Sequence, residues 1–391
     1  EQRKAAGADL LPKLSASYSY TNLKDQPYAV VGGSRLPMSS DEIYKWNVAA
    51  VQPLFTGFAL STRYEMARYG VDLTRTSRDL ARMDVAYRVR DAYYTSLLAR
   101  RYREVADEAV ENLRSHVKDA ETFYDQGIIP YNDLLKSKVA LAAAMQNRER
   151  ALANEESAVS SLNMLLGLSL DTRTRLADIL EEGSGPELSL DTLSAEALES
   201  RPELKAMRTA LINADNAVRL ARSVYYPTVS LVGAYERVGD NPKADDNDYG
   251  NDHNASVGIE ARWQFFEWGK TRAEVNRAIF EKYALEEQKR GLEDAVRLDV
   301  KNAFLDVGVS RANIATAREA LDQARENYRI TNLQYQQQVT TSTEVLDART
   351  ALSQAETSYY GSLYGYLRAI ARLDRALGRM PAASAQQARQ D

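Results

Sequence analysis

Apolar and polar residues alternate strictly in four short segments of the chain. In LPKLSASYSY (residues 11–20), leucine, alanine and tyrosine fall on one face and serine on the other. Because successive side chains of a strand point to opposite faces, this period of two predicts β-strands. Their expected bounds are about 12–21, 46–55, 226–235 and 255–266. In the last of them Glu260 and Arg262 fall on the polar face.

Four much longer segments have helical spacing and almost no helix-breaking residue. Their expected bounds are about 58–126, 131–166, 268–337 and 342–377. At 1.5 Å per residue the first would extend roughly 100 Å, which is typical of a coiled-coil or bundled rod. A loop rich in Gly and Pro is expected over 22–45, and a further helix is expected over about 194–224.

The second half of the chain repeats the first at an offset of 211 residues, the difference between Tyr124 and Tyr335. The same offset relates Phe55 to Phe266, Val89 to Val300, Leu162 to Leu373 and Gly167 to Gly378. We therefore expect two structural repeats, 1–167 and 194–378, an equatorial linker, 168–193, and a disordered tail, 379–391. Only the second repeat has a long helical segment before its first strand. We therefore expect the first repeat's N-terminal helix, and any signal before it, to be truncated here.

Composition excludes several classes of protein. The net charge of −5 argues against a nucleic-acid partner, and the lack of cysteine excludes disulfides and thiolate sites. The sequence has no HExxH, P-loop or GxSxG motif, so we expect no enzyme, catalytic residue or cofactor. Of the two histidines, we expect His116 to be solvated on a helix. His253 lies among aspartates, where a solvated loop is favoured over a weak divalent-cation site, so no metal is expected.

Four two-faced strands favour a membrane, but they cannot close a barrel alone. Strands of about ten residues with one apolar and one polar face fit a lipid-facing barrel, and no helix has the roughly 20 apolar residues of a span. Open sheet edges are not tolerated in lipid, so several chains must share one barrel. The alternative is a half-exposed sheet on a soluble periplasmic helical-hairpin scaffold or adaptor protein without a pore.

The order and spacing of eight motifs resemble the TolC-like outer-membrane efflux protein family. The strand motifs are LPKLSASYSY and YPTVSLVGAY, and the junctions into the long helices are QPLFTGF and QFFEWGK. The hairpin tips are YDQGIIPYNDLL and YQQQVTTSTEVLDA, and the helix ends are LNMLLGL and LDRALGR. The resemblance covers nearly the whole chain and its duplication.

This resemblance implies a mixed α/β membrane protein that is mainly α. Three copies would form a homotrimer with a twelve-stranded β-barrel, four strands per chain, continued by a long α-helical barrel of coiled-coil hairpins. The implied location is the outer membrane of a Gram-negative bacterium, in contact with outer-membrane lipid and extending into the periplasm. The implied function is a channel for exported small molecules or proteins, gated until a periplasmic adaptor and an inner-membrane pump of RND, ABC or MFS type engage it.

Two carboxylates near the second tip are candidates for a channel constriction. Glu344 and Asp347 are three residues apart, so they fall on one helical face. In a symmetric trimer each residue near the axis becomes a ring of three, and acidic rings favour cations. The alternative is that Glu344 is an acid in the first turn of a helix and Asp347 is solvated. The resemblance implies the constriction.

The resemblance also implies contacts that close the tips, between a Tyr and a basic residue of the second tip and an acid of the first. Tyr335 and Asp133 match the Tyr and the acid. The basic position is Thr340, which cannot form an ion pair, and the glycine of the second tip is Gln338, although Gly127 is kept in the first. Tyr124, the counterpart of Tyr335, is a further candidate contact. We also expect Glu260 and Arg262 to face the lumen of the barrel.

Overall fold

The computed structural model describes residues 1–178 and 189–380, so most of the expected tail and part of the expected linker lie outside it. The chain divides into two compact units. The sheet unit comprises Glu1–Thr76 and Ala206–Arg290, and the hairpin unit comprises Ser77–Lys205 and Gly291–Asp391. Three of the helices, α2, α5 and α6, each contribute one part to either unit.

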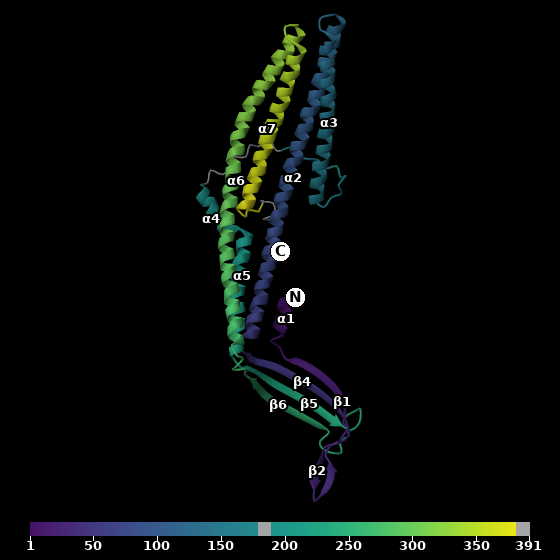
Figure 1. Ribbon diagram of the computed structural model, residues 1–391, viewed down its shortest axis with the longest axis vertical. Helices are drawn as coiled ribbons and strands as arrows, with labels where there is room; N and C mark the ends of the chain where they lie inside the picture. The colour runs from purple at the N-terminus through teal and green to yellow at the C-terminus, as the bar shows by residue number, and fades with distance from the viewer. Residues whose placement is uncertain (179–188, 381–391) are drawn as a thin grey trace. The chain divides into compact units, whose positions relative to one another are not determined.

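The sheet unit contains a four-stranded antiparallel sheet in the order β1-β4-β5-β6 (Figure 1). Its strands are β1 (Lys13–Asn22), β4 (Glu42–Thr56), β5 (Thr228–Gly239) and β6 (His253–Arg262). The unit also holds α1 (Gln2–Ala8), α5 (Pro202–Arg222) from Ala206 onward, a 3₁₀ turn (Ser223–Tyr225) and the first parts of α2 and α6. Within the described residues, β1 and β6 each pair on one side only.

The register of the sheet places most apolar side chains on one face and most polar side chains on the other, with exceptions such as Arg237 opposite Trp46. Residues directly opposite each other point to the same side. Tyr18 lies opposite Trp46, with ring centroids 4.7 Å apart, and Val257 continues this apolar face on the last strand. The opposite face carries an ion pair between Lys45 and Glu236. The two faces predicted from the alternation are therefore present.

The two strand hairpins have the same internal register. Lys13 pairs with Val51 in the first, and Thr228 pairs with Arg262 in the second. Thr228 lies 215 residues after Lys13, and Arg262 lies 211 residues after Val51. The sequence shows the same two offsets, so the duplication extends to backbone pairing.

Three sequence-based expectations about this part of the chain were wrong. The predicted loop 22–45 contains a second hairpin, β2 (Tyr28–Val31) with β3 (Ser34–Pro37), turned by two glycines at positive φ, and β4 already begins at Glu42. Strand β6 ends at Arg262 rather than near 266, because its partner β5 begins only at Thr228, after Pro227. The predicted helix 194–224 is two helices, α4 (Leu190–Ser200) and α5, because Pro202 holds Arg201 in an extended conformation.

The hairpin unit contains two antiparallel helical hairpins (Figure 1). One joins α2 (Ala59–Asp125) to α3 (Tyr131–Leu165), and the other joins α6 (Lys270–Gln336) to α7 (Ser342–Ala376). Each bound of the second hairpin lies 211 residues after the corresponding bound of the first, and all lie within two residues of the expected bounds. No helix in the described residues is both long and apolar enough to cross a membrane.

Apolar packing and ion pairs hold the helices of this unit together. One core cluster is built around Val296, Val300 and Leu373 of α6 and α7, with Leu193 of α4 packed against it. A second joins α2 to α7 through Leu97 and other side chains. Further along, α2 and α7 are linked by charge-assisted hydrogen bonds, Arg90 to Asp374 and Arg375 to Asp84, both 2.8 Å.

Both hairpin tips end their first helix with the same capping motif. The N–H of Ile128 donates to the carbonyl of Phe123 at 2.9 Å, and the N–H of Val339 donates to the carbonyl of Gln334 at 2.8 Å. These are the six-to-one bonds of a Schellman motif, which needs a left-handed residue just before the donor. Gly127 supplies it in the first tip (φ 74°), and Gln338 adopts it in the second (φ 63°) despite its side chain.

Because a left-handed backbone costs a non-glycine residue about 1–2 kcal/mol, Gln338→Gly should stabilise the second tip. The flexibility of glycine in the unfolded chain offsets part of the gain, leaving about 0.5–1 kcal/mol. Hydrogen exchange of the amides around the tip should slow by about two- to fivefold. The matched control Gln337→Gly, at a residue without positive φ, should speed that exchange or leave it unchanged. Equal effects of the two substitutions would contradict strain at Gln338.

Candidate functional site at the hairpin tips

All four hairpin helices meet in a buried polar cluster just behind the tips. Nε2 of His116 on α2 lies 2.8 Å from Oγ of Ser342 on α7, and that oxygen lies 2.8 Å from Oγ of Ser137 on α3. The ring of Tyr335 on α6 packs against the imidazole with its centroid 4.6 Å away. His116, Tyr335 and Ser342 are each 2% exposed, so the cluster is shielded from solvent.

The buried position of His116 corrects the expectation that it is solvated. His116 follows Leu113 by three residues and precedes Ala120 by four, and both neighbours are buried on the same face of α2. This helical spacing indicates that His116 is buried. The prediction that it is solvated rested on the polarity of histidine alone. Ser137 and Ser342 carried no such signal, because their proximity depends on how the two hairpins pack.

Burial lowers the pKa of His116 from 6.5 to about 4, and the carboxylate of Asp119 opposes this shift only weakly. The folded protein therefore prefers the neutral imidazole, which shares a hydrogen bond with Ser342. Below pH 6.5 the unfolded or locally opened chain binds a proton that the closed tip excludes. The contribution of neutral His116 to the stability of the closed tip is fully present above pH 6.5 and is lost as the pH falls towards 4.

The tips should therefore open more readily at acidic pH. Between pH 6.5 and pH 4 the free energy of opening the tips should fall by up to about 3 kcal/mol, because each pKa unit corresponds to about 1.4 kcal/mol. Hydrogen exchange at the amides of both tips, compared at pH 7 and pH 4.5 after correction for intrinsic rates, measures it. His116→Gln should flatten the profile, whereas His253→Gln, at an exposed histidine of β6, should leave it unchanged. A profile unaffected by His116→Gln would contradict this role.

The residues expected to close the tips are brought together only in part. A cavity of about 230 Å³ at the tips is lined by Tyr335, Thr340 and Asp133, together with Ser342. Asp133 forms an ion pair with Lys136 of its own helix at 3.1 Å. Tyr124 does not line this cavity; its ring packs 5.2 Å from that of Tyr131 in the same hairpin.

The acid pair, Glu344 and Asp347, lies in the first two turns of α7 with both residues exposed. The N–H of Glu344 donates to Oγ1 of the N-cap residue Thr341 at 3.5 Å, which orients the start of the helix. Within the described residues neither carboxylate forms an ion pair or a side-chain hydrogen bond. Their negative charge is therefore available to ions or to another protein chain.

In the sheet unit, Glu260 and Arg262 lie on the polar face and pair with each other, Nη2 to Oε1 at 2.7 Å. His253, expected in a loop, is the first residue of β6 and pairs with Arg237. Its Nδ1 lies 2.8 Å from Asp252, and both residues are exposed enough for solvent to screen the contact. Across residues 1–178 and 189–380, no group of three His, Asp or Glu side chains is arranged to hold a metal ion.

Comparison with known proteins identifies the fold and the family. The profile of the family described as "Outer membrane efflux protein" matches residues 1–168 and 193–379. The chain is 21% identical to the outer membrane protein TolC of Escherichia coli strain K12 over 397 residues, covering 97% of this chain and 76% of TolC. It is 20% identical to the outer membrane efflux protein BepC of Brucella suis over 329 residues, covering 82% of this chain and 71% of BepC.

Solved structures of outer-membrane channels share this fold. CusC superposes with a TM-score of 0.83 at 17% identity, covering 97% of this chain and 86% of CusC. The CmeC outer membrane channel of Campylobacter jejuni superposes with a TM-score of 0.81 at 16% identity, covering 100% of this chain and 83% of CmeC. The family is one of channels rather than enzymes, and nothing in the match favours a scaffold without a pore. The chain therefore belongs to the outer membrane efflux protein family and is an efflux protein of the outer membrane.

Proposed function

We propose that three copies of the chain share one twelve-stranded β-barrel that continues into a helical conduit, and that exported molecules leave through it. The observation that carries this proposal is the pair of free edges of a two-faced sheet. Strands β1 and β6 each have one unpaired side, and unpaired edges are not stable in lipid. Pairing β6 of one copy with β1 of the next removes every edge once the ring closes.

The two faces of the sheet support this arrangement. The apolar face, with Tyr18, Trp46 and Val257, has the composition of a lipid-facing surface with interfacial aromatic residues. The opposite face would line the lumen, which gives Glu260 and Arg262 an aqueous environment. Twelve strands leave a water-filled bore, whereas eight would be nearly filled by side chains.

The hairpin tips are the proposed gate. In a closed trimer, Glu344 and Asp347 would form two rings of three carboxylates at the entrance, and the buried cluster of His116, Ser342 and Tyr335 would hold the two hairpins of each chain together. A periplasmic adaptor and an inner-membrane pump of RND, ABC or MFS type are the proposed partners. Their binding would favour splayed tips and so shift the gate towards its open state.

The duplicated helix bounds support a proposed division into two repeats, 1–167 and 194–378. Helix α4 begins at Leu190, inside the segment proposed as the equatorial linker 168–193, and its N-cap Ser189 accepts from the N–H of Thr192. The two repeats are not functionally equal, because only the second tip carries the acid pair. The counterparts of Glu344 and Asp347 at the same offset are Asp133 and Lys136, which pair with each other.

The oligomeric state of the purified protein tests this proposal. The chain should require detergent, sediment as a trimer, and migrate in SDS as a trimer unless it is heated, as closed barrels resist the detergent until boiled. A monodisperse monomer in buffer without detergent would contradict the shared barrel and would favour the helical scaffold.

A further inference from the structure

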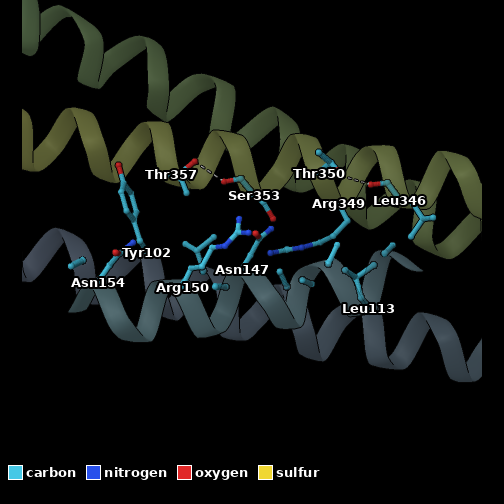
Figure 2. Close-up of a pocket in the computed structure, with 18 residues that line it drawn as sticks. Tyr102, Leu113, Asn147, Arg150, Asn154, Leu346, Arg349, Thr350, Ser353 and Thr357 are labelled. Carbon is cyan, nitrogen blue, oxygen red and sulfur yellow. Dashed lines mark hydrogen bonds between the residues drawn. The ribbon is translucent and has the colours of Figure 1, made fainter. Parts of the chain in front are cut away.

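A second, larger cavity lies between α2, α3 and α7 of the hairpin unit (Figure 2). Its volume is about 480 Å³, within the range of about 300–1,000 Å³ that is usual for small-molecule sites. Seven alanines line it, with further apolar surface from Val105, Leu113 and Leu346. It shares no lining residue with the tip cavity. The wall is therefore smooth and mainly apolar, which suits an alkyl chain.

The lining of this cavity also includes a buried cation whose hydrogen bonds are incomplete. Arg349 of α7 is 2% exposed, and its Nε and Nη1 atoms are buried without a hydrogen-bond partner. Nη2 donates to Glu356 at 3.3 Å, while Nη1 lies 3.9 Å from Glu108, too far for a hydrogen bond. A buried donor left without an acceptor destabilises the folded state, and more so when the group is charged. Two donor atoms of this guanidinium, Nε and Nη1, therefore lack an acceptor.

The rest of the cavity wall adds positive charge and no negative charge. Figure 2 shows Arg349 from α7 and Arg150 from α3 both extending towards the middle of the cavity, with Asn147 beside them. Arg150 forms no ion pair or hydrogen bond within the described part of the chain. No Asp or Glu is among the described residues that line the cavity; the acids that interact with Arg349, Glu356 and Glu108, are not part of its lining. The missing acceptor would therefore be an anion that enters from the cavity.

We propose that this cavity binds the anion of a long-chain fatty acid. Its carboxylate accepts a hydrogen bond from Arg349 and is attracted by Arg150, and its alkyl chain lies along the alanine-lined wall. A charge-assisted hydrogen bond to a buried guanidinium is among the stronger polar contacts in proteins, which favours a carboxylate over a neutral alcohol. A fatty acid bound here contacts both hairpins, because α3 and α7 belong to different ones.

Photolabelling of the assembled trimer in non-ionic detergent tests the site. The probe is a long-chain fatty acid that carries a diazirine near the end of its tail, and labelled peptides are mapped by mass spectrometry. Peptides of α3 and α7 that line the cavity should be labelled, and dodecanoate should compete while dodecanol, with the same tail and no charge, should not. Labelling of the apolar face of the sheet, around Val257 and Ile259, is the internal reference for non-specific partition.

Substitutions in the wall make the test specific. Arg349→Gln should weaken competition by dodecanoate about tenfold or more. Arg349→Gln also leaves Glu356 without its partner, so two variants at exposed positions are tested beside it. They are Arg150→Gln and the cavity-filling Ala143→Leu. Each should weaken competition by dodecanoate several-fold. Arg114→Gln, an exposed arginine of α2 outside the cavity, is the control and should change nothing.

Three results would overturn the proposal. The first is an absence of labelling in the cavity lining of trimers whose sheet is labelled, and the second is equal competition by dodecanol. The third is unchanged competition in both Arg150→Gln and Ala143→Leu. Because all measurements are made on assembled trimers, failure of the fatty-acid site is distinguishable from failure of the channel proposal.

Discussion

Replacing the acid pair with Glu344→Gln and Asp347→Asn should weaken block by a trivalent cation by at least about tenfold in single-channel recordings. Under the proposed trimer, the two substitutions remove six negative charges from one narrow entrance. Even in bulk water, a unit charge pair at 4 Å is worth about 1 kcal/mol, and a confined entrance strengthens it. The selectivity for cations over anions should fall together with the block, because both depend on the same field.

The chain offers a matched control for this experiment. Glu319 and Asp322 of α6 have the same spacing of three residues, are likewise exposed, and lie in the same hairpin away from its tip. Glu319→Gln with Asp322→Asn also removes six charges from the trimer but should leave block and selectivity close to those of the parent. If both double variants lose block equally, the effect is one of general surface charge, and the constriction is not at the acid pair.

A cysteine pair at Ser19 and Glu260 should convert the trimer into a covalent ring. The prediction follows from the duplication, since the junction between β4 and β5 within one chain is the template for the junction between β6 and the next chain's β1. In the chain, Ala49 pairs with Ala234. The counterpart of Ala49 in the second repeat, 211 residues later, is Glu260. The counterpart of Ala234 in the first repeat, 215 residues earlier, is Ser19. Directly paired strand residues have Cα atoms about 4.5–5.5 Å apart, which a disulfide spans.

The parent chain has no cysteine, so the cross-link pattern is unambiguous. After oxidation, most of the Ser19→Cys, Glu260→Cys protein should run as a trimer on a denaturing gel without reductant, even after boiling. Ser15→Cys with Glu260→Cys is the control, because four residues along a strand displace the partner by about 13 Å. Equal trimer yields from both pairs, or none from the first in trimers shown to be intact, would contradict the predicted register.

Much of the scaffold could be predicted because its signals are local and repeated. The helices extend over dozens of residues with no proline and few glycines, and α3 and α7 end just before a glycine in the left-handed conformation, Gly167 and Gly378. The alternation in the strands predicted which residues share a face of the sheet, because successive side chains of a strand must point to opposite faces. The short β2–β3 hairpin was missed because four residues are too few to establish a period.

The interior of the tip region could be predicted only in part, because it depends on contacts between hairpins. The family resemblance implies that Tyr335 is a closure contact, which stays a prediction; the structure shows that Tyr335 is buried against His116. Its actual neighbour His116 was assigned to solvent, since a polar residue type was given more weight than its helical spacing. Nothing local distinguishes Arg349 from the many exposed arginines of these helices, so the charged cavity became visible only in three dimensions.

The proposal that trimers of this chain form a channel with an acidic constriction is tested most directly by the current through single trimers in a planar lipid bilayer. We predict discrete, cation-selective conductance steps that a trivalent cation blocks from the side of the helical tips, with the block weakened in the acid-pair variant. Trimers of correct size that insert into the bilayer without discrete steps, or steps whose block is the same with and without Glu344 and Asp347, would contradict it.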